Sequence, residues 1–104
     1  MRISSLDGRR IALWGWGREG RAAWRALRGR GIGPLALFCN PREAAEARAL
    51  DPALRVEPEA NAARLSAYDV VVKSPGNSPY QPGPQAAMAA GTRFVGGTAL
   101  WFGE

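Results

Sequence analysis

The sequence predicts an α/β fold in which about five parallel strands form a doubly wound sheet between two layers of helices. Short apolar runs alternate along the chain with segments of helical periodicity, and neighbouring parallel strands need such crossover helices. The run Val70-Val71-Val72 is apolar at every position, which is typical of a strand buried on both faces. Right-handed crossovers reduce the number of topologies further. At 104 residues, we expect one domain spanning residues 1–104.

The first half of the chain supplies two strand–helix units. Small apolar residues recur at spacings of three and four after the first strand, which predicts a helix lying close against a sheet. Asn40 is a suitable cap for the second helix, and Pro41 suits its first turn. The expected elements are a strand over 10–14, a helix over 18–28, a strand over 35–39 and a helix over 41–50.

The second half continues the alternation with shorter elements. A loop containing Pro75, Pro79 and Pro82 separates the valine-rich strand from the helix that follows it. The sequence contains no internal repeat and no long linker. The expected elements are a weak strand over 54–57, a short helix over 61–67, a strand over 68–73, a helix over 83–90 and a last strand over 93–95.

The composition excludes several kinds of chemistry. With no histidine and one cysteine, the chain has no histidine general base, no Cys/His zinc site, no disulfide framework and no Ser-His-Asp arrangement. No stretch approaches the ~18 consecutive apolar residues of a membrane span, and residues 1–10 lack the apolar centre of a signal peptide. We therefore expect a cytoplasmic protein that does not bind a membrane.

The basic residues are almost all arginine. The net charge of +5 comes with 14 basic residues, of which only Lys73 is a lysine. Arg18, Arg21, Arg25 and Arg28 fall at helical spacing, which predicts one solvated helix face. No recognised nucleic-acid-binding motif is present, so nucleic acid is not an expected partner.

A glycine-rich turn joins the first strand to the first helix. In this GxGxxG pattern, Gly15 permits the tight turn, Gly17 lets a ligand approach the backbone, and Gly20 lets helix and strand pack closely. Exposed amides at the helix start, aided by the helix dipole, form an anion site suited to a pyrophosphate. The alternative is that the glycines serve turn geometry alone, in a domain that only contacts other proteins.

The end of the second strand argues against NAD. An acid about 20 residues after the glycine loop would bind the ribose hydroxyls of NAD, but the first acid here is Glu43. Arg42 would instead meet the 2′-phosphate of NADP. An NADP-binding module of an oxidoreductase is therefore the alternative function, although an arginine on a helix surface is often only solvated.

A second loop follows the valine-rich strand. Ser74 offers a hydroxyl, Gly76 an unobstructed backbone and Asn77 an amide. Ligands of open parallel sheets bind outside the carboxyl ends of the strands, so this loop and the glycine loop are expected to flank one crevice. The alternative is a turn stiffened by its prolines.

Three segments together resemble the N-terminal domain of the Mur ligases, and in particular of the members that add glutamate. The resemblance spans nearly the whole chain. It rests on Gly15-Trp16-Gly17-Arg18-Glu19-Gly20, on Asp69-Val70-Val71-Val72-Lys73-Ser74-Pro75-Gly76, and on the tail from Gly91 to Trp101.

The resemblance implies a domain that binds UDP-N-acetylmuramoyl-alanine, with the glycine loop near the diphosphate and the Ser-Pro-Gly loop near the uridine. In such relatives an acid at the end of the second strand meets the uracil, whereas this chain has Phe38, Cys39 and Asn40 there. Asn40 or Asn77 would replace that hydrogen bonding, and Phe38 would stack on the base or belong to the core. The binding residues expected are Gly15, Gly17, Arg18, Glu19, Gly20, Asn40, Ser74, Gly76 and Asn77.

The resemblance also implies ATP-dependent amide formation, for which this chain lacks the means. It has no GxxxxGK[ST] phosphate loop, and Lys73 stands at a strand end without one. We therefore expect no catalytic residue, metal or cofactor in this domain, with ATP and Mg²⁺ bound by a central domain beyond it. The central and C-terminal domains of a parent ligase are the expected protein partners.

The aromatic residues and the cysteine are interpreted mainly as packing. Trp14, Trp24 and Trp101 are expected to fill the layers of a small parallel-sheet domain. Trp16 stands inside the glycine loop, where we expect partial exposure and contact with a nucleotide or a neighbouring domain. Cys39 is expected to be a small buried residue whose thiol is not activated.

Overall fold

Strands and helices alternate along the chain in the computed structural model, which describes residues 9–31, 35–57, 61–73 and 82–96. Each predicted element is confirmed to within a few residues. The strands are β1 (Ile11–Trp14), β2 (Leu35–Phe38), β3 (Arg55–Glu57), β4 (Val70–Lys73) and β5 (Arg93–Gly96), and the helices are α1 (Arg18–Gly29), α2 (Pro41–Leu50), α3 (Ala62–Leu65) and α4 (Pro82–Ala89). Within the described ranges, no helix is long and apolar enough to cross a bilayer.

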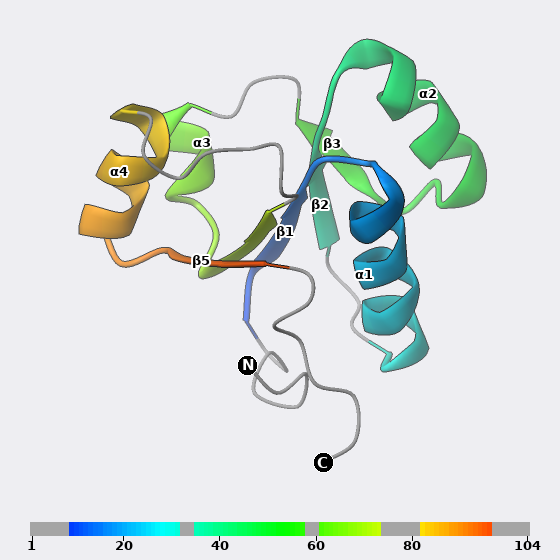
Figure 1. The fold of residues 1–104 in the computed structure, drawn as a ribbon, viewed down its shortest axis with the longest axis horizontal. Helices are drawn as coiled ribbons and strands as arrows, with labels where there is room; N and C mark the ends of the chain where they lie inside the picture. Colours follow the sequence, from blue (N-terminus) through cyan, green and yellow to red (C-terminus); the bar gives the residue numbers. More distant parts are fainter. Residues whose placement is uncertain (1–8, 32–34, 58–60, 74–81, 97–104) are drawn as a thin grey trace.

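The five strands form one parallel sheet in the order β3-β2-β1-β4-β5 (Figure 1). The central strand, β1, pairs with a neighbour on each side, so that Ile11 lies opposite both Leu35 and Val70. β3 and β5 form the two outer strands. This order reverses direction at β1, which confirms the doubly wound topology expected from the alternating elements.

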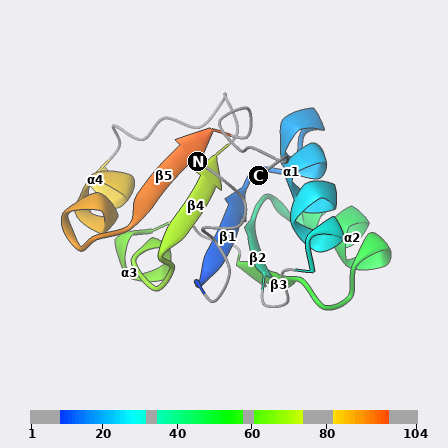
Figure 2. The same ribbon diagram turned by 90° about the horizontal axis from the view of Figure 1, so that it is seen from below.

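Two layers of helices enclose the sheet, with α1 and α2 on one face and α3 and α4 on the other (Figure 2). Successive side chains of β1 point to opposite faces of the sheet, so that Leu13 packs on the α1 face and Ala12 on the α3 face. Full burial of a Leu or Val side chain contributes roughly 1.5–3 kcal/mol. The core residues with no exposed surface are Ala12, Leu13, Leu27, Leu37, Ala47, Leu65, Val70, Val71 and Ala87.

Asparagine side chains start two of the helices. The Asn40 side chain accepts a hydrogen bond of 2.8 Å from the backbone N–H of Glu43, and Pro41 occupies the first turn of α2, as predicted. Asn61 caps α3 in the same way, accepting from the backbone N–H of Arg64 at 3.0 Å. These caps satisfy amide groups that the first turn of a helix leaves without partners.

α1 is tied to the turn after α2 by one carboxylate. Asp51 Oδ2 accepts hydrogen bonds from Arg28 Nε at 2.7 Å and from Trp24 Nε1 at 2.9 Å. The predicted solvated arginine face is therefore wrong at Arg28, whose side chain is only 23% exposed. Arg21 forms an ion pair with Glu46 at 3.4 Å while its side chain stays 43% exposed, and Arg18 and Arg25 are exposed as predicted.

Hydrogen bonds hold Asp51 in its charged form. Burial by itself raises the pKa of this carboxyl, but the bonds from Trp24, Arg28 and the Ala53 N–H, with the charge of Arg28, outweigh burial and lower the pKa. A carboxyl with a lowered folded-state pKa stabilises the fold above its unfolded pKa of about 3.9. That stabilisation is lost as the pH falls through the folded-state value.

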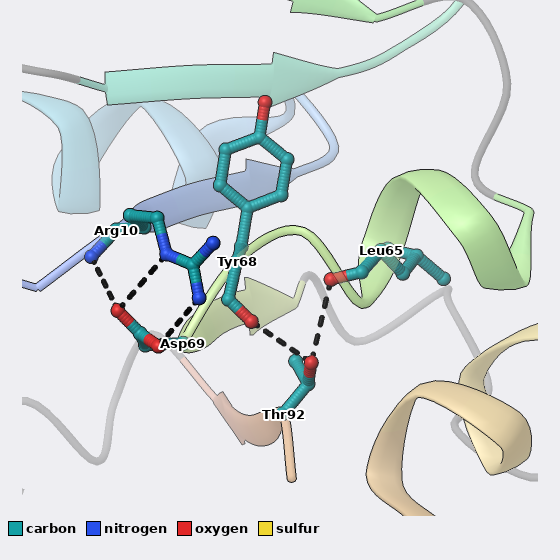
Figure 3. Close-up of polar contacts among 5 residues, drawn as sticks. All are labelled: Arg10, Leu65, Tyr68, Asp69 and Thr92. Carbon is teal, nitrogen blue, oxygen red and sulfur yellow. Dashed lines mark hydrogen bonds and ion pairs between the residues drawn. The ribbon is translucent and has the colours of Figure 1, made fainter. Parts of the chain in front are cut away.

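Two further contacts join the amino-terminal ends of the strands (Figure 3). The carboxylate of Asp69, just before β4, accepts hydrogen bonds from Arg10 Nη2 at 3.2 Å and from the Arg10 backbone N–H at 2.8 Å. The bond from the Arg10 side chain lowers the pKa of Asp69. Thr92, just before β5, donates its hydroxyl to the Tyr68 carbonyl at 2.8 Å.

Asp51→Asn is expected to reduce the free energy of unfolding at pH 7 by about 1–3 kcal/mol, because Arg28 then loses its charged partner. The difference from the parent chain should shrink as the pH falls below about 4, where the carboxyl takes up a proton. Urea denaturation at several pH values measures both effects.

The matched control is Glu46→Gln, which removes the exposed carboxylate of another α1–α2 ion pair. It should change stability by less than about 0.5 kcal/mol at every pH. Equal stability of Asp51→Asn and the parent at pH 7 would contradict this account of the α1 anchor.

Candidate functional site

The glycine loop lies at the carboxyl end of β1, where the chain turns into α1. Gly15 has a φ of +109°, a conformation that side chains other than glycine's rarely adopt. Its N–H donates a 2.8 Å hydrogen bond to the carbonyl of Phe38, which fixes the loop to the end of β2. The predicted tight-turn role of Gly15 is confirmed.

Gly17 starts α1 and leaves its backbone open. Its carbonyl accepts the first helical hydrogen bond, from the N–H of Arg21 at 2.9 Å, but as a glycine it offers no side-chain cap. A Cβ built on Gly17 would have no atom within 4 Å. An exposed backbone in open space, at the positive end of a twelve-residue helix, is an arrangement that suits an anion.

The other loop residues divide between surface and packing. Arg18 is exposed and Glu19 is half-buried in the first turn of α1. Gly20 is buried, in keeping with its predicted role in close helix–strand packing. The structure therefore brings Gly15, Gly17, Arg18, Glu19 and Gly20 together at one end of the sheet.

Asn40 follows β2 at the same edge, because Phe38 lies opposite Trp14 in the sheet. The side chain of Asn40 is exposed, and its Oδ1 is taken up by the cap of α2. Its Nδ2 is therefore the group with which it would donate to a ligand. Arg42, the residue of the NADP alternative, is exposed in the first turn of α2.

The loop after β4 lies outside the described residues, so Ser74, Gly76 and Asn77 have no described positions. The preceding strand ends at Lys73, which lies opposite Trp14 across the pairing of β1 with β4. That register places the end of β4 beside the end of β1. The shared crevice between the two loops remains a prediction.

Phe38 and Cys39 are packing residues. Phe38 is 1% exposed, and its ring meets that of Tyr68 edge-on at 5.7 Å, so it belongs to the core and is not free to stack on a base. Cys39 is half-buried, and burial together with the charge of Glu43 raises the pKa of its thiol. An inert thiol is what the sequence predicted.

The prediction for Trp16 is wrong. Its side chain is 2% exposed and packs 5.4 Å from the ring of Trp24, beneath α1. An indole buries a large apolar area, and that burial outweighs exposure in the loop. Nε1 of Trp16 is buried, and no described residue forms a hydrogen bond with it. Trp24 packs as predicted but also donates to Asp51, while Trp14 packs against Phe94.

A sheet of this order, with a glycine loop at the carboxyl end of its central strand, defines a Rossmann-like domain. Domains of this class bind ligands at the carboxyl ends of the strands where the strand order reverses, which here is between β1 and β4. Comparison with known proteins identifies the group within this class. No protein-family model matches the chain.

The chain is similar over its whole length to enzymes named UDP-N-acetylmuramoyl-L-alanine--L-glutamate ligase. It is 59% identical to that of Xanthomonas campestris pv. campestris (strain 8004), an alignment that covers 100% of this chain and 23% of the relative. It is 60% identical to that of Xylella fastidiosa (strain Temecula1), over 98% of the chain and 22% of the relative. The ligase of Salinispora tropica is 38% identical over 100% of the chain and 24% of the relative.

The chain belongs to the Mur ligase family and corresponds to the N-terminal part of its glutamate-adding members. This confirms the resemblance found in the sequence. The chain spans less than a quarter of the length of these relatives. The comparisons give the oxidoreductase alternative no support.

Gly15→Ala is expected to reduce the free energy of unfolding by about 1–3 kcal/mol, because a Cβ strains the positive-φ turn. Gly17→Ser is the matched control in the same loop. Its extended backbone and open surroundings accept a side chain, and the hydroxyl can cap α1, so stability should stay within about 0.5 kcal/mol or rise slightly. Urea denaturation of both variants measures the difference, and a Gly15→Ala chain as stable as the parent would overturn the role of this turn.

Proposed function

We propose that the chain binds UDP-N-acetylmuramoyl-L-alanine for a cytoplasmic, ATP-dependent ligase that adds glutamate to this precursor of peptidoglycan. The observation that carries the proposal is the open backbone of Gly17 at the start of α1. The names of the relatives specify L-glutamate as the amino acid that those enzymes add.

The diphosphate of the precursor is proposed to lie against the first turn of α1. Amides at the start of a helix have no partners within the helix and carry partial positive charge. Gly17 allows the phosphates to approach these amides closely, and Arg18 is exposed beside them. Both features favour a doubly charged anion at this edge.

Uracil is proposed to be recognised by neutral amides instead of an acid. Because Asn40 Oδ1 caps α2, the Nδ2 of Asn40 would donate to a carbonyl oxygen of uracil. The uracil N–H then requires a separate acceptor, for which Asn77 is the proposed residue. Ser74 and Gly76 would complete the uridine side of the crevice.

The reaction itself is proposed to occur in a central domain that binds ATP and Mg²⁺. The carboxylate of the precursor's alanine would be phosphorylated by ATP, and the amine of glutamate would then displace phosphate to form the amide. This chain would hold the UDP end and so orient the alanine carboxylate toward the central and C-terminal domains. Its contribution is the entropic advantage of positioning, without a catalytic residue of its own.

Gly17→Val tests the proposed function directly. The variant should weaken binding of UDP-N-acetylmuramoyl-L-alanine by at least about tenfold, because the side chain fills the space over the loop backbone. The space around Gly17 and its φ of −75° leave the fold intact. Isothermal titration calorimetry of the 104-residue chain measures the affinity.

Gly29→Val is the matched control at the other end of the same helix. A Cβ at Gly29 also has no atom within 4 Å, so this change adds the same side chain away from the loop. Its affinity should lie within twofold of the parent. Unchanged binding in Gly17→Val would remove the glycine loop from the site.

A further inference from the structure

A pocket of about 500 Å³ opens at the amino-terminal edge of the sheet, opposite the glycine loop. Its walls come from the starts of β1 and β2, from the whole of β3 with the residues before it, and from the turn before β4. A volume of this size suits a small organic molecule. Residues that matter for recognition are Arg10, Ala36, Ala53, Arg55, Glu57 and Tyr68.

The pocket exists because the helical layer on this face is short. α3 has only four residues, and with α4 it lies toward β4 and β5 (Figure 2). Ala36 and Ala53 present only methyl groups where longer side chains would fill the space beside β2 and β3. Small residues beneath an incomplete layer leave an apolar hollow.

One wall is an aromatic ring held in place at three points. Tyr68 meets Phe38 edge-on at 5.7 Å, and its hydroxyl donates to Glu57 Oε2 at 3.4 Å. Its backbone carbonyl accepts from Thr92 at 2.8 Å, as Figure 3 shows. Burial and the charge of Glu57 raise the pKa of Tyr68, so the phenol is neutral at pH 7.

The carboxylate inside the pocket is already occupied. The side chain of Glu57 is only 8% exposed, and its Oε1 accepts from Arg64 Nη1 at 3.0 Å. Arg55 is 76% exposed, and its Nε lies 4.0 Å from the same oxygen. Arg55 is therefore only loosely engaged by Glu57.

A second guanidinium stands at the pocket mouth with a fixed orientation. Asp69 holds Arg10 through Nε at 3.4 Å and Nη2 at 3.2 Å, yet the Arg10 side chain remains 66% exposed. A guanidinium has five N–H groups, so these bonds leave donors for a ligand. With Arg55 and Arg64, three guanidinium groups face two carboxylates around the pocket, which gives its mouth an excess positive charge.

We propose that this pocket binds a small organic anion with a flat apolar body, its carboxylate between Arg10 and Arg55 and its body between the Tyr68 ring and the methyl groups of Ala36 and Ala53. Guanidinium groups match planar carboxylates, and the aromatic wall matches a planar body. The four residues of β1 separate this pocket from the glycine loop by about 13 Å of strand. The pocket therefore binds its ligand independently of the proposed UDP site.

Amide chemical shifts during titration with 2-naphthoate test the proposal. We expect saturable shifts at Ile11, Ala36 and Ala53, with Gly17 unaffected. 2-Naphthamide has the same body without the charge, and acetate has the charge without the body, so each should bind at least about fivefold more weakly. Equal shifts with the amide, equal shifts with acetate, or no saturation by millimolar naphthoate would each overturn the proposal.

Two variants with matched controls locate the binding. Arg55→Gln should weaken naphthoate binding by about fivefold, whereas Arg25→Gln on the exposed face of α1 should leave it unchanged. Ala53→Phe should fill the pocket and weaken binding at least tenfold. The matched control is Ala49→Phe, a surface change four residues earlier in the chain, which should leave binding unchanged. If naphthoate binds Ala53→Phe and Arg55→Gln as it binds the parent, the site lies elsewhere and the proposal is wrong.

Discussion

The pairing of β1 with a parallel strand on each side is the constraint on which the rest of the structure depends. Because β1 is central, its residues are buried by helices on both faces. The helices that follow its two neighbours, α2 and α4, lie on opposite faces of the sheet. The chain must then leave the end of β1 by a sharp turn into α1. Gly15 provides that turn, and its hydrogen bond to Phe38 ties the turn to β2.

Parallel pairing also gives the domain two chemically different edges. Helices run against the strands, so the positive end of α1 lies at the carboxyl edge, where Gly17 leaves the backbone open to an anion. The opposite edge receives the negative end of α1, where Arg28 is paired with Asp51. Arg10 and the pocket beside Tyr68 also lie at the amino edge, far from the glycine loop along the strand direction. One backbone arrangement thus separates two candidate binding regions.

The sequence predicted what local chemistry determines. The cap at Asn40, the turn at Gly15 and the fully buried strand at Val71 each follow from residue types within a few positions of one another. The glycine loop predicted a ligand edge because its spacing combines a turn, an open backbone and a close packing contact. Its resemblance to the Mur ligases then indicated a ligand class.

Contacts between distant segments were not predictable in the same way. Trp16 was expected in a loop at the surface, but Trp24 offers it a buried partner that only the packing of α1 reveals. Arg28 looked solvated because its partner, Asp51, is 23 residues further along the chain. The amino-edge pocket likewise depends on the short length of α3, which has four residues. The sequence predicted a longer helix, over residues 61–67.

The central claim is that the glycine loop of this chain receives the diphosphate of a UDP-linked precursor. The most direct measurement is a heteronuclear NMR titration of the 104-residue chain with UDP-N-acetylmuramoyl-L-alanine and, separately, with NADPH at matched ionic strength. The account predicts shifts at residues 15–20 and Asn40 with the UDP compound and none with NADPH. A response to NADPH alone, centred on Gly17 and Arg42, would contradict it.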